Sequence, residues 1–175
     1  MLFRSRLPIY IDPGQAFGTG THESTQLTLE SMERWIDAKH VVFDLGTGSG
    51  ILAIAASMLG ATTVFGCDND PVAVEVAAEN TERNKVPRIG LMCGSIDSVR
   101  ANTVSLLLCN VTADVITAIF PEIQRSLCSG AVSIFSGILA IQSEGIRKLT
   151  ESYGHTVLEE TTRGEWYSLT TRNGR

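Results

Sequence analysis

The stretch that decides the fold reads Val41-Val42-Phe43-Asp44-Leu45-Gly46-Thr47-Gly48-Ser49-Gly50. Its first half is too short and too β-branched for a helix, so it predicts a buried strand, and the apolar run 51–56 that follows predicts the start of a helix. Three glycines at alternate positions let the backbone turn sharply between the two and present N–H groups to a ligand. The stretch therefore predicts a cofactor that carries a nucleotide.

Two details of this stretch indicate which cofactor it is. The dinucleotide fingerprint needs its third glycine at position 51, but that position is Ile51 and the glycine falls at Gly50. Asp44 adds a carboxylate two residues before the first glycine. That charge would repel a pyrophosphate, yet it could pair with the α-ammonium of a bound amino acid, directly or through water. An adenosine joined to an amino acid is S-adenosylmethionine, which we take as the predicted cofactor.

A second acidic residue lies at the end of the next predicted strand, 62–67. Asp68 follows Gly46 by 22 residues, in the window where an acidic side chain accepts hydrogen bonds from both ribose hydroxyls. We therefore predict that Asp68 anchors the ribose, with a helix N-cap as the alternative or additional role. Asp70-Pro71 predicts the start of the following helix, since proline at the first turn lacks only an N–H that would be unpaired anyway.

The bulk composition predicts one globular domain, 1–175, in which residues 1–36 form an N-terminal loop and helix over the cofactor site and residues 37–175 form an α/β core. The chain has 175 residues, 43% hydrophobic and 19% charged. No window is apolar enough for a membrane span, and no secretory signal is evident, so we expect a cytoplasmic protein that contacts no membrane. The formal charge of −5 argues against direct nucleic-acid binding and fits a basic protein substrate better. The sequence does not specify an oligomeric state.

Strands and helices alternate from Val41 onward, which predicts a Rossmann-like, mostly parallel sheet with helices on both faces. The predicted strands are 41–45, 62–67, 89–93, 104–109, 131–135, 155–160 and 165–171, and the predicted helices are 23–36, 49–59, 71–84, 112–127 and 140–153. No helix separates the last two strands, so they predict a C-terminal antiparallel hairpin with its turn near Arg163-Gly164. Ligands of such sheets lie at the carboxyl ends of the strands.

Further candidate residues lie on that edge of the sheet. Ser95 and Ile96 follow the third strand and are placed to meet an adenine, Ser95 by a hydrogen bond and Ile96 by apolar contact, although Ser95 could equally be an ordinary loop serine. Asn110 ends the fourth strand and would face the methyl group of the cofactor. The alternative is a strand-end cap before the next helix.

The loop 8–22 is rich in glycine and threonine and precedes the first core strand. It suits a lid that closes over a bound cofactor, and a flexible N-terminal arm is the alternative. The four cysteines form no C-x-x-C pair, so we interpret Cys67, Cys93, Cys109 and Cys128 as reduced structural thiols and predict no metal site. A site built from Cys67 and Cys93 lacks a suitably spaced histidine.

Several of these segments together resemble the ribosomal protein L11 methyltransferases, over about residues 12–171. The segments are Gly14-Gln15-Ala16-Phe17-Gly18-Thr19-Gly20-Thr21-His22-Glu23-Ser24-Thr25, 44–56, Asp68-Asn69-Asp70-Pro71, Asn110-Val111-Thr112-Ala113, Ser136-Gly137-Ile138-Leu139 and Gly164-Glu165-Trp166. The glycine turn is common to all class I methyltransferases, whereas the loop and the Ser136–Leu139 segment are much more specific.

The resemblance implies a seven-stranded sheet and methylation, dependent on S-adenosylmethionine, of amino groups on ribosomal protein L11: lysine side chains and the N-terminal amine. By matching positions it implies cofactor contacts at Thr25, Gly46, Asp68 and Asn110. The full predicted cofactor set is Thr25, Asp44, Gly46, Thr47, Gly48, Asp68, Asn69, Ser95, Ile96 and Asn110, with Asn110 also the catalytic candidate.

This sequence departs from the family pattern at three points. Ser24 stands where threonine is usual, and Asn110 is followed by Val-Thr-Ala rather than Ile-Leu-Ala. The family also carries a separate N-terminal domain that holds the ribosomal protein, whereas this chain begins just before the glycine-rich loop. Two alternatives therefore stay open: a methyltransferase for another protein or a small molecule, and a non-catalytic module that binds the cofactor. No dedicated general base is evident, and His22 is either that base or a residue that caps the loop.

Overall fold

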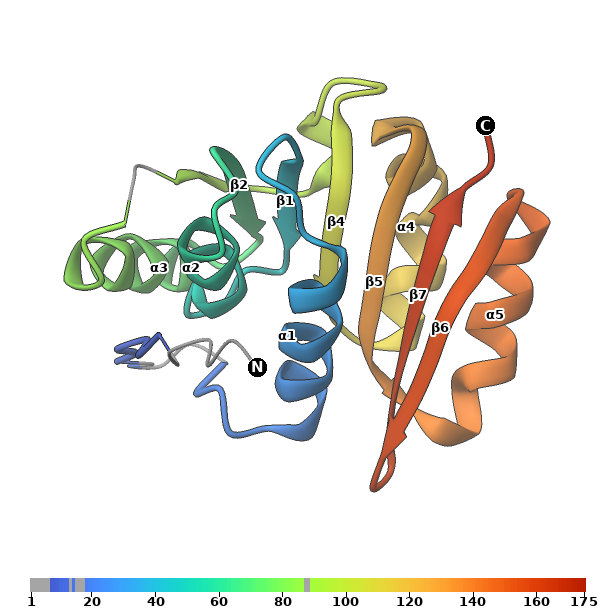
Figure 1. Ribbon diagram of the computed structural model, residues 1–175, viewed down its shortest axis with the longest axis horizontal. Helices are drawn as coiled ribbons and strands as arrows, with labels where there is room; N and C mark the ends of the chain where they lie inside the picture. Colours follow the sequence, from blue (N-terminus) through green and yellow to red (C-terminus); the bar gives the residue numbers. More distant parts are fainter. Residues whose placement is uncertain (1–6, 13, 15–17, 87–88) are drawn as a thin grey trace, which may run out of the picture.

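The computed structural model describes residues 7–12, 14, 18–86 and 89–175, which form one seven-stranded sheet flanked by helices (Figure 1). In chain order its elements are α1 (Glu23–Trp35), β1 (Val41–Leu45), α2 (Ile51–Met58), β2 (Thr63–Asp68), α3 (Pro71–Arg83), β3 (Gly90–Cys93), η1 (Ile96–Ser98), β4 (Val104–Asn110), α4 (Ala113–Ser126), β5 (Leu127–Leu139), η2 (Ala140–Gln142), α5 (Ser143–Ser152), β6 (His155–Arg163) and β7 (Trp166–Asn173).

The strand order is β3-β2-β1-β4-β5-β7-β6. Neighbouring strands from β3 to β5 pair in parallel, and β7 pairs antiparallel with both β5 and β6. The predicted fold class is therefore confirmed: a Rossmann-like, mostly parallel, seven-stranded sheet that ends in an antiparallel hairpin. Since β1, β2 and β4 are adjacent and parallel, their carboxyl ends meet at one edge of the sheet, which positions the site described below.

Each central strand is apolar on both faces because both faces are covered. Val42 belongs to a core cluster with residues of α1 and α2, whereas Phe43, the next residue, belongs to a cluster with residues of α4 and α5. Successive side chains of a strand point to opposite faces, which accounts for this alternation. Figure 1 shows α1, α2 and α3 on the near face of the sheet and α4 with α5 on the far face. None of the helices in the described ranges is long and apolar enough to cross a membrane.

Most predicted boundaries agree with the structure to within three residues, and β5 is the main exception. It was expected at 131–135 but runs from Leu127 to Leu139. Its first residue pairs with Val104 of β4, ahead of a register shift, and its last pairs with Trp166 of β7, beyond a second shift. Irregular pairing of this kind depends on the neighbouring strands, so the local pattern of apolar residues predicted only the regular centre of β5.

Candidate functional site

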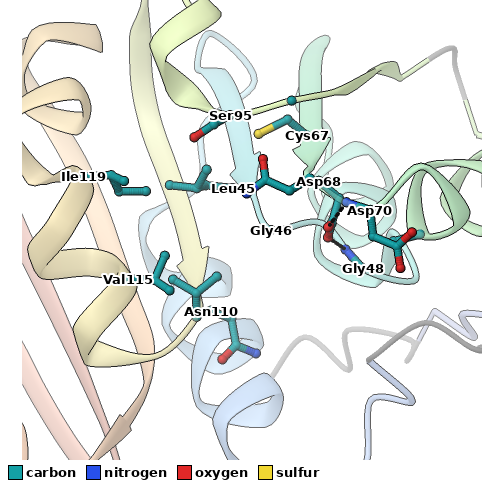
Figure 2. Close-up of a pocket in the computed structure, with 14 residues that line it drawn as sticks. Leu45, Gly46, Gly48, Cys67, Asp68, Asp70, Ser95, Asn110, Val115 and Ile119 are labelled. Atoms are coloured by element: carbon teal, nitrogen blue, oxygen red, sulfur yellow. Dashed lines mark hydrogen bonds between the residues drawn. The ribbon is translucent and has the colours of Figure 1, made fainter.

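A cavity of about 410 Å³ lies at the carboxyl ends of β1, β2 and β4. This volume is within the range of roughly 300–1,000 Å³ that is typical of small-molecule sites. Its walls are formed by Leu45, Gly46, Gly48, Cys67, Asp68, Asn69, Asp70, Ala73, Gly94, Ser95, Asn110, Val111, Val115 and Ile119, most of which Figure 2 labels. The predicted residues Gly46, Gly48, Asp68, Asn69, Ser95 and Asn110 are thus brought together, whereas Thr25, Asp44, Thr47 and Ile96 are not part of the lining.

The glycine turn is fastened to β2 by its own N–H groups. Those of Gly46 and Thr47 both donate to the carbonyl oxygen of Cys67 at 2.9 Å, and that of Gly48 donates to Asp68 Oδ2 at 3.0 Å. The N–H of Gly50 donates to the carbonyl of Thr47 at 2.9 Å. The expectation that these N–H groups face a ligand is therefore wrong, because this turn between β1 and α2 satisfies its buried donors within the chain.

Close packing explains why the first position of this turn is a glycine. Gly46 has φ +73°, and a Cβ atom placed on it would lie 2.6 Å from Val111 Cγ1. The absence of a side chain at Gly46 lets the end of β1 approach the segment that follows β4. Two walls of the cavity, the turn and Val111, are thereby held against each other.

Asp68 is the acidic residue that lines the cavity at the end of β2. Its Oδ2 accepts the Gly48 N–H and its Oδ1 accepts the Asp70 N–H, both at 3.0 Å (Figure 2). Because an ionised carboxylate has about four acceptor positions, two remain for a ligand. The N-cap alternative for Asp68 is wrong: Asp70 caps α3, since its Oδ1 accepts the Val72 N–H at 2.9 Å and Pro71 occupies the first helical position.

Asp44 lies beneath the turn and is completely buried. Its Oδ2 accepts hydrogen bonds from Thr47 Oγ1 at 2.7 Å and from the Ala53 N–H at 3.2 Å, whereas Oδ1 has no partner in the described part of the chain. The pKa of Asp44 is raised from 3.8 to about 7, mainly by burial and to a smaller extent by the nearby Asp68, whereas the two hydrogen bonds act to lower it. A buried carboxyl with an unpaired oxygen is a site that a cation would stabilise. Thr47 acts on this carboxyl rather than on the cavity.

The cavity wall beyond β3 differs from the prediction. Ser95 lines it and makes no side-chain hydrogen bond as the cap of η1, but Ile96 has no exposed surface and packs in the core with Ile116 and Phe120. As it lies, Ile96 cannot reach a ligand in the cavity. The apolar wall is instead provided by Val115 and Ile119 of α4. The spacing of four residues between Val115 and Ile119 places them on one face of the predicted helix 112–127, a signal that could have identified this wall.

Asn110 is held in place by three elements, β4, α1 and β5. Its Nδ2 donates to Oγ1 of Thr25, a buried residue of α1, at 3.3 Å. On the other side, a Cβ atom on Gly137 would lie only 3.0 Å from Asn110 Oδ1 and 2.7 Å from the carbonyl oxygen of Val111. Ser136 Oγ donates to the carbonyl of Ser24 at 3.0 Å and fixes α1 against β5. Within the described residues Asn110 Oδ1 accepts no hydrogen bond, so it is the available acceptor of this amide.

His22 caps the N-terminus of α1. Its Nδ1 accepts the Ser24 N–H at 3.3 Å and lies 2.8 Å from Ser24 Oγ, and its ring meets that of Trp166 edge-on at 4.6 Å between centroids. The capping role weighed for His22 is confirmed, and His22 does not line the cavity. Of the loop 8–22 expected to form a lid, residues 13 and 15–17 lie outside the described residues, and the lid stays a prediction.

The cysteines are all free thiols, as expected. Cys67 and Cys109 are buried, and burial raises the pKa of Cys67 to about 12 and that of Cys109 further. Cys93, however, is exposed on the edge strand β3 rather than packed in the core. No three His, Cys, Asp or Glu side chains converge as a metal site would require in the ranges that the structure describes.

Comparison with known proteins gives consistent results. The family model described as Ribosomal protein L11 methyltransferase (PrmA) matches residues 3–174. A ribosomal protein L11 methyltransferase of Desulforapulum autotrophicum is 41% identical over 163 residues, which cover 92% of this chain and 54% of that protein. The chain thus spans about half the length of the curated relatives it matches.

Solved structures are similar over nearly the whole chain. That of a ribosomal protein L11 methylase from Lactobacillus delbrueckii subsp. bulgaricus superposes with a TM-score of 0.87 at 31% identity and covers 95% of this chain and 86% of that one. The crystal structure of M. jannaschii TYW2 in complex with AdoMet has a TM-score of 0.69 at 14% identity, and the match covers 86% of this chain and 75% of that one. At that identity the likeness shows a common fold alone.

Proposed function

Because this chain belongs to the ribosomal protein L11 methyltransferase family, we propose that it transfers a methyl group from S-adenosylmethionine to amino groups of ribosomal protein L11. The observation that carries the proposal is the cavity in which Asp68 and Asn110 face a common space, with the buried carboxyl of Asp44 beneath the adjoining turn. Lysine side chains and the N-terminal amine are the acceptors that we propose.

The side chains of the site fit the polar groups of S-adenosylmethionine. Asp44 Oδ1 is a buried acceptor without a partner in the described part of the chain, and the α-ammonium group is a cation that would pair with it, directly or through water. Asp68 retains acceptor positions for the two ribose hydroxyls. Ser95 offers a hydroxyl to the adenine, and Val115 with Ile119 offers it an apolar wall.

The acceptor amine must reach the methyl group as a neutral nitrogen. A lysine ammonium with a pKa near 10.4 costs about 4.6 kcal/mol to deprotonate at pH 7, and desolvation lowers that cost. The bound cofactor supplies a sulfonium methyl group for in-line displacement. Asn110 Oδ1 carries no charge and accepts no other hydrogen bond from the described residues, so it can accept one from the amine and orient the lone pair. Alignment of the two reactants is then the main task of the chain.

Two measurements test the proposal. Calorimetry with S-adenosylmethionine and with NAD should show binding of the former only, and tighter binding of NAD would overturn the cofactor assignment. Methyl incorporation into purified ribosomal protein L11 should then be compared for the wild-type chain and for Asn110→Ala, with a melting curve for each. We expect Asn110→Ala to lose one to two orders of magnitude in rate, about 1.4–2.8 kcal/mol of transition-state stabilisation, and to retain most cofactor affinity.

The outcomes separate the possible roles. Full activity in Asn110→Ala would refute the orienting role. A parallel loss of rate, affinity and thermal stability would identify Asn110 as a strand-end cap. If the wild-type chain binds S-adenosylmethionine and methylates no amine of ribosomal protein L11, the proposed substrate is wrong while the cofactor assignment stands.

A further inference from the structure

Asn80 of α3 and Asn84, the C-cap of α3, hold the segment 7–12, which includes the start of the loop 8–22. Asn84 Oδ1 accepts the Tyr10 N–H at 2.8 Å, and Asn84 Nδ2 donates to the Tyr10 carbonyl at 2.7 Å. One helical turn earlier, Asn80 Oδ1 accepts the Asp12 N–H and Asn80 Nδ2 donates to the Asp12 carbonyl, both at 3.0 Å. Each amide thus pairs with both backbone groups of one residue, as a neighbouring β-strand would. We call residues 7–12 the arm.

The spacing of the two asparagines fixes the register of the arm. Residues four apart on a helix are separated by about 6.0 Å along its axis, and residues two apart in an extended chain by about 6.6–6.8 Å. The arm therefore runs antiparallel to α3 with one extended dipeptide for each helical turn. The same register continues to position 76, since a Cβ atom on Gly14 would meet Val76 Cγ2 at 3.5 Å. A one-step shift of the arm would break all four amide contacts.

Asn80 also reaches the glycine turn of the cofactor site. Its Nδ2 donates a second hydrogen bond to the carbonyl of Ser49 at 2.9 Å, and its Oδ1 accepts one from the Arg83 guanidinium at 3.0 Å. Asn80 is fully buried, and these four hydrogen bonds satisfy both donors and both acceptor positions of its amide. Ser49 directly follows Gly48, whose N–H is bound to Asp68. Asn84, in contrast, contacts the arm and the end of α3 but not the turn.

We propose that Asn80 is a positioning residue for cofactor binding. Asn80 joins the arm to the glycine turn, so that cofactor affinity and arm docking depend on each other. The proposal rests on the function proposed above. With Ser49 held by Asn80 and Gly48 held by Asp68, the turn has one conformation at the wall of the cavity. Without the Asn80 amide the turn would keep its contacts with β2, with Asp44 and, through Ser49 Oγ, with the Gly18 carbonyl, but the Ser49 carbonyl would lose its partner on α3. A cofactor would then bind only the fraction of molecules with the correct turn.

Linkage makes the coupling reciprocal. If the docked arm favours the binding-competent turn, then a bound cofactor must favour the docked arm by the same factor. The amide hydrogens of Tyr10 and Asp12 report arm docking directly, because they donate to Asn84 and Asn80 respectively. Hydrogen exchange at these two positions therefore measures the coupling without any substitution.

The test combines calorimetry with amide exchange measured by NMR. In the wild-type chain, S-adenosylmethionine should slow exchange of the Asp12 amide by about tenfold. Asn80→Ala should raise the Kd for S-adenosylmethionine by about tenfold, as expected if about one molecule in ten retains the competent turn. Asn80→Asp keeps the acceptor oxygen and removes both donors, and it should have the same effect. Asn84→Ala is the matched control: it removes the pairing with Tyr10 but leaves Asp12 docked on Asn80 and the Asn80–Ser49 hydrogen bond in place, so it should change the Kd by no more than about twofold.

The possible results distinguish the proposed role of Asn80 from its alternatives. Cofactor affinity within about twofold of wild type in folded Asn80→Ala or Asn80→Asp would overturn the proposal, as would wild-type exchange at Asp12 that the cofactor leaves unchanged. An equal loss of affinity in Asn84→Ala and Asn80→Ala would assign the effect to the arm as a whole and not to the link with Ser49. Failure of the wild-type chain to bind S-adenosylmethionine refutes the proposed function instead, and it is detected before any variant is made.

Discussion

Replacement of Asp44 by asparagine should change how the stability of the fold depends on pH. Asp44 is completely buried, and its pKa of about 7 lies above the ordinary value of 3.8. Between these values the folded protein holds a proton on Asp44 that the unfolded chain has lost. Folding is therefore favoured at low pH, and this contribution is lost as the pH rises through about 7. Asparagine has the shape of the protonated acid and does not titrate. The Asp44→Asn protein should therefore not lose this stability as the pH rises.

The magnitude follows from the two pKa values. The interval between about pH 5 and the folded pKa of about 7 is about two pH units. At 1.36 kcal/mol for each unit, the wild-type protein loses about 2.7 kcal/mol of stability over this interval. We treat this as an upper limit, because solvent penetration and relaxation reduce the cost of a buried charge. Urea unfolding of both proteins at about pH 5 and about pH 8 gives the four free energies required. The advantage of Asp44→Asn over wild type should increase by about 1–3 kcal/mol between the two conditions.

Other titrating groups cancel in this comparison. Burial lowers the pKa of His155 to about 4, so its contribution to stability rises with pH between that value and about 6.5, opposite in sign to that of Asp44. His155 is the same in both proteins and drops out of the difference. If the advantage of Asp44→Asn is the same at both pH values, Asp44 ionises normally in the fold. The argument from its burial and its unpaired oxygen would then be refuted.

Two further variants test the walls of the cavity. Asp68→Ala should weaken binding of S-adenosylmethionine by roughly 1.5–3 kcal/mol, the range for hydrogen bonds to a charged group, and normal binding by calorimetry would assign the ribose to another residue. Gly137→Ala should destabilise the fold by about 1–3 kcal/mol in urea unfolding, since φ is +76° and the added Cβ would lie 2.7 Å from the Val111 carbonyl oxygen. It should also lower the methylation rate more than cofactor affinity, because the displaced Asn110 would no longer meet the amine correctly. Unchanged kinetics would show that Asn110 does not depend on Gly137.

Much of the fold could be predicted because local patterns determine it. Runs such as Leu106–Cys109 are apolar at every position, which requires cover on both faces of the strand. The hairpin of β6 and β7 followed from two strand patterns with no helix between them. Strands that end in polar residues placed Asp68 and Asn110 at one edge of the sheet, and both line the cavity. In each case the information lies within a few neighbouring residues.

The parts that the sequence did not predict depend on contacts between distant segments. Ile96 was expected to contact adenine, yet it packs into the core with residues of β4 and α4. The apolar wall of the cavity is formed by Val115 and Ile119 instead. Thr25 matches a family position, but only the structure shows that its hydroxyl lies against Asn110, 85 residues away in the chain. The pairing of Asn80 with Asp12 likewise spans 68 residues. No periodicity within one segment contains such information.

The glycine turn supports the predicted cofactor, but for a different physical reason from the spacing of its glycines. Alternate glycines predicted free N–H groups, but those of Gly46, Thr47, Gly48 and Gly50 are all bound within the chain. A pyrophosphate is recognised mainly by such N–H groups, so this turn offers it few donors and two nearby carboxyls, Asp44 and Asp68. A ligand with an ammonium group and two ribose hydroxyls fits the turn better, because these groups are donors and both carboxyls have acceptor positions left. The distribution of acceptors, rather than the glycine spacing, therefore favours S-adenosylmethionine over a dinucleotide.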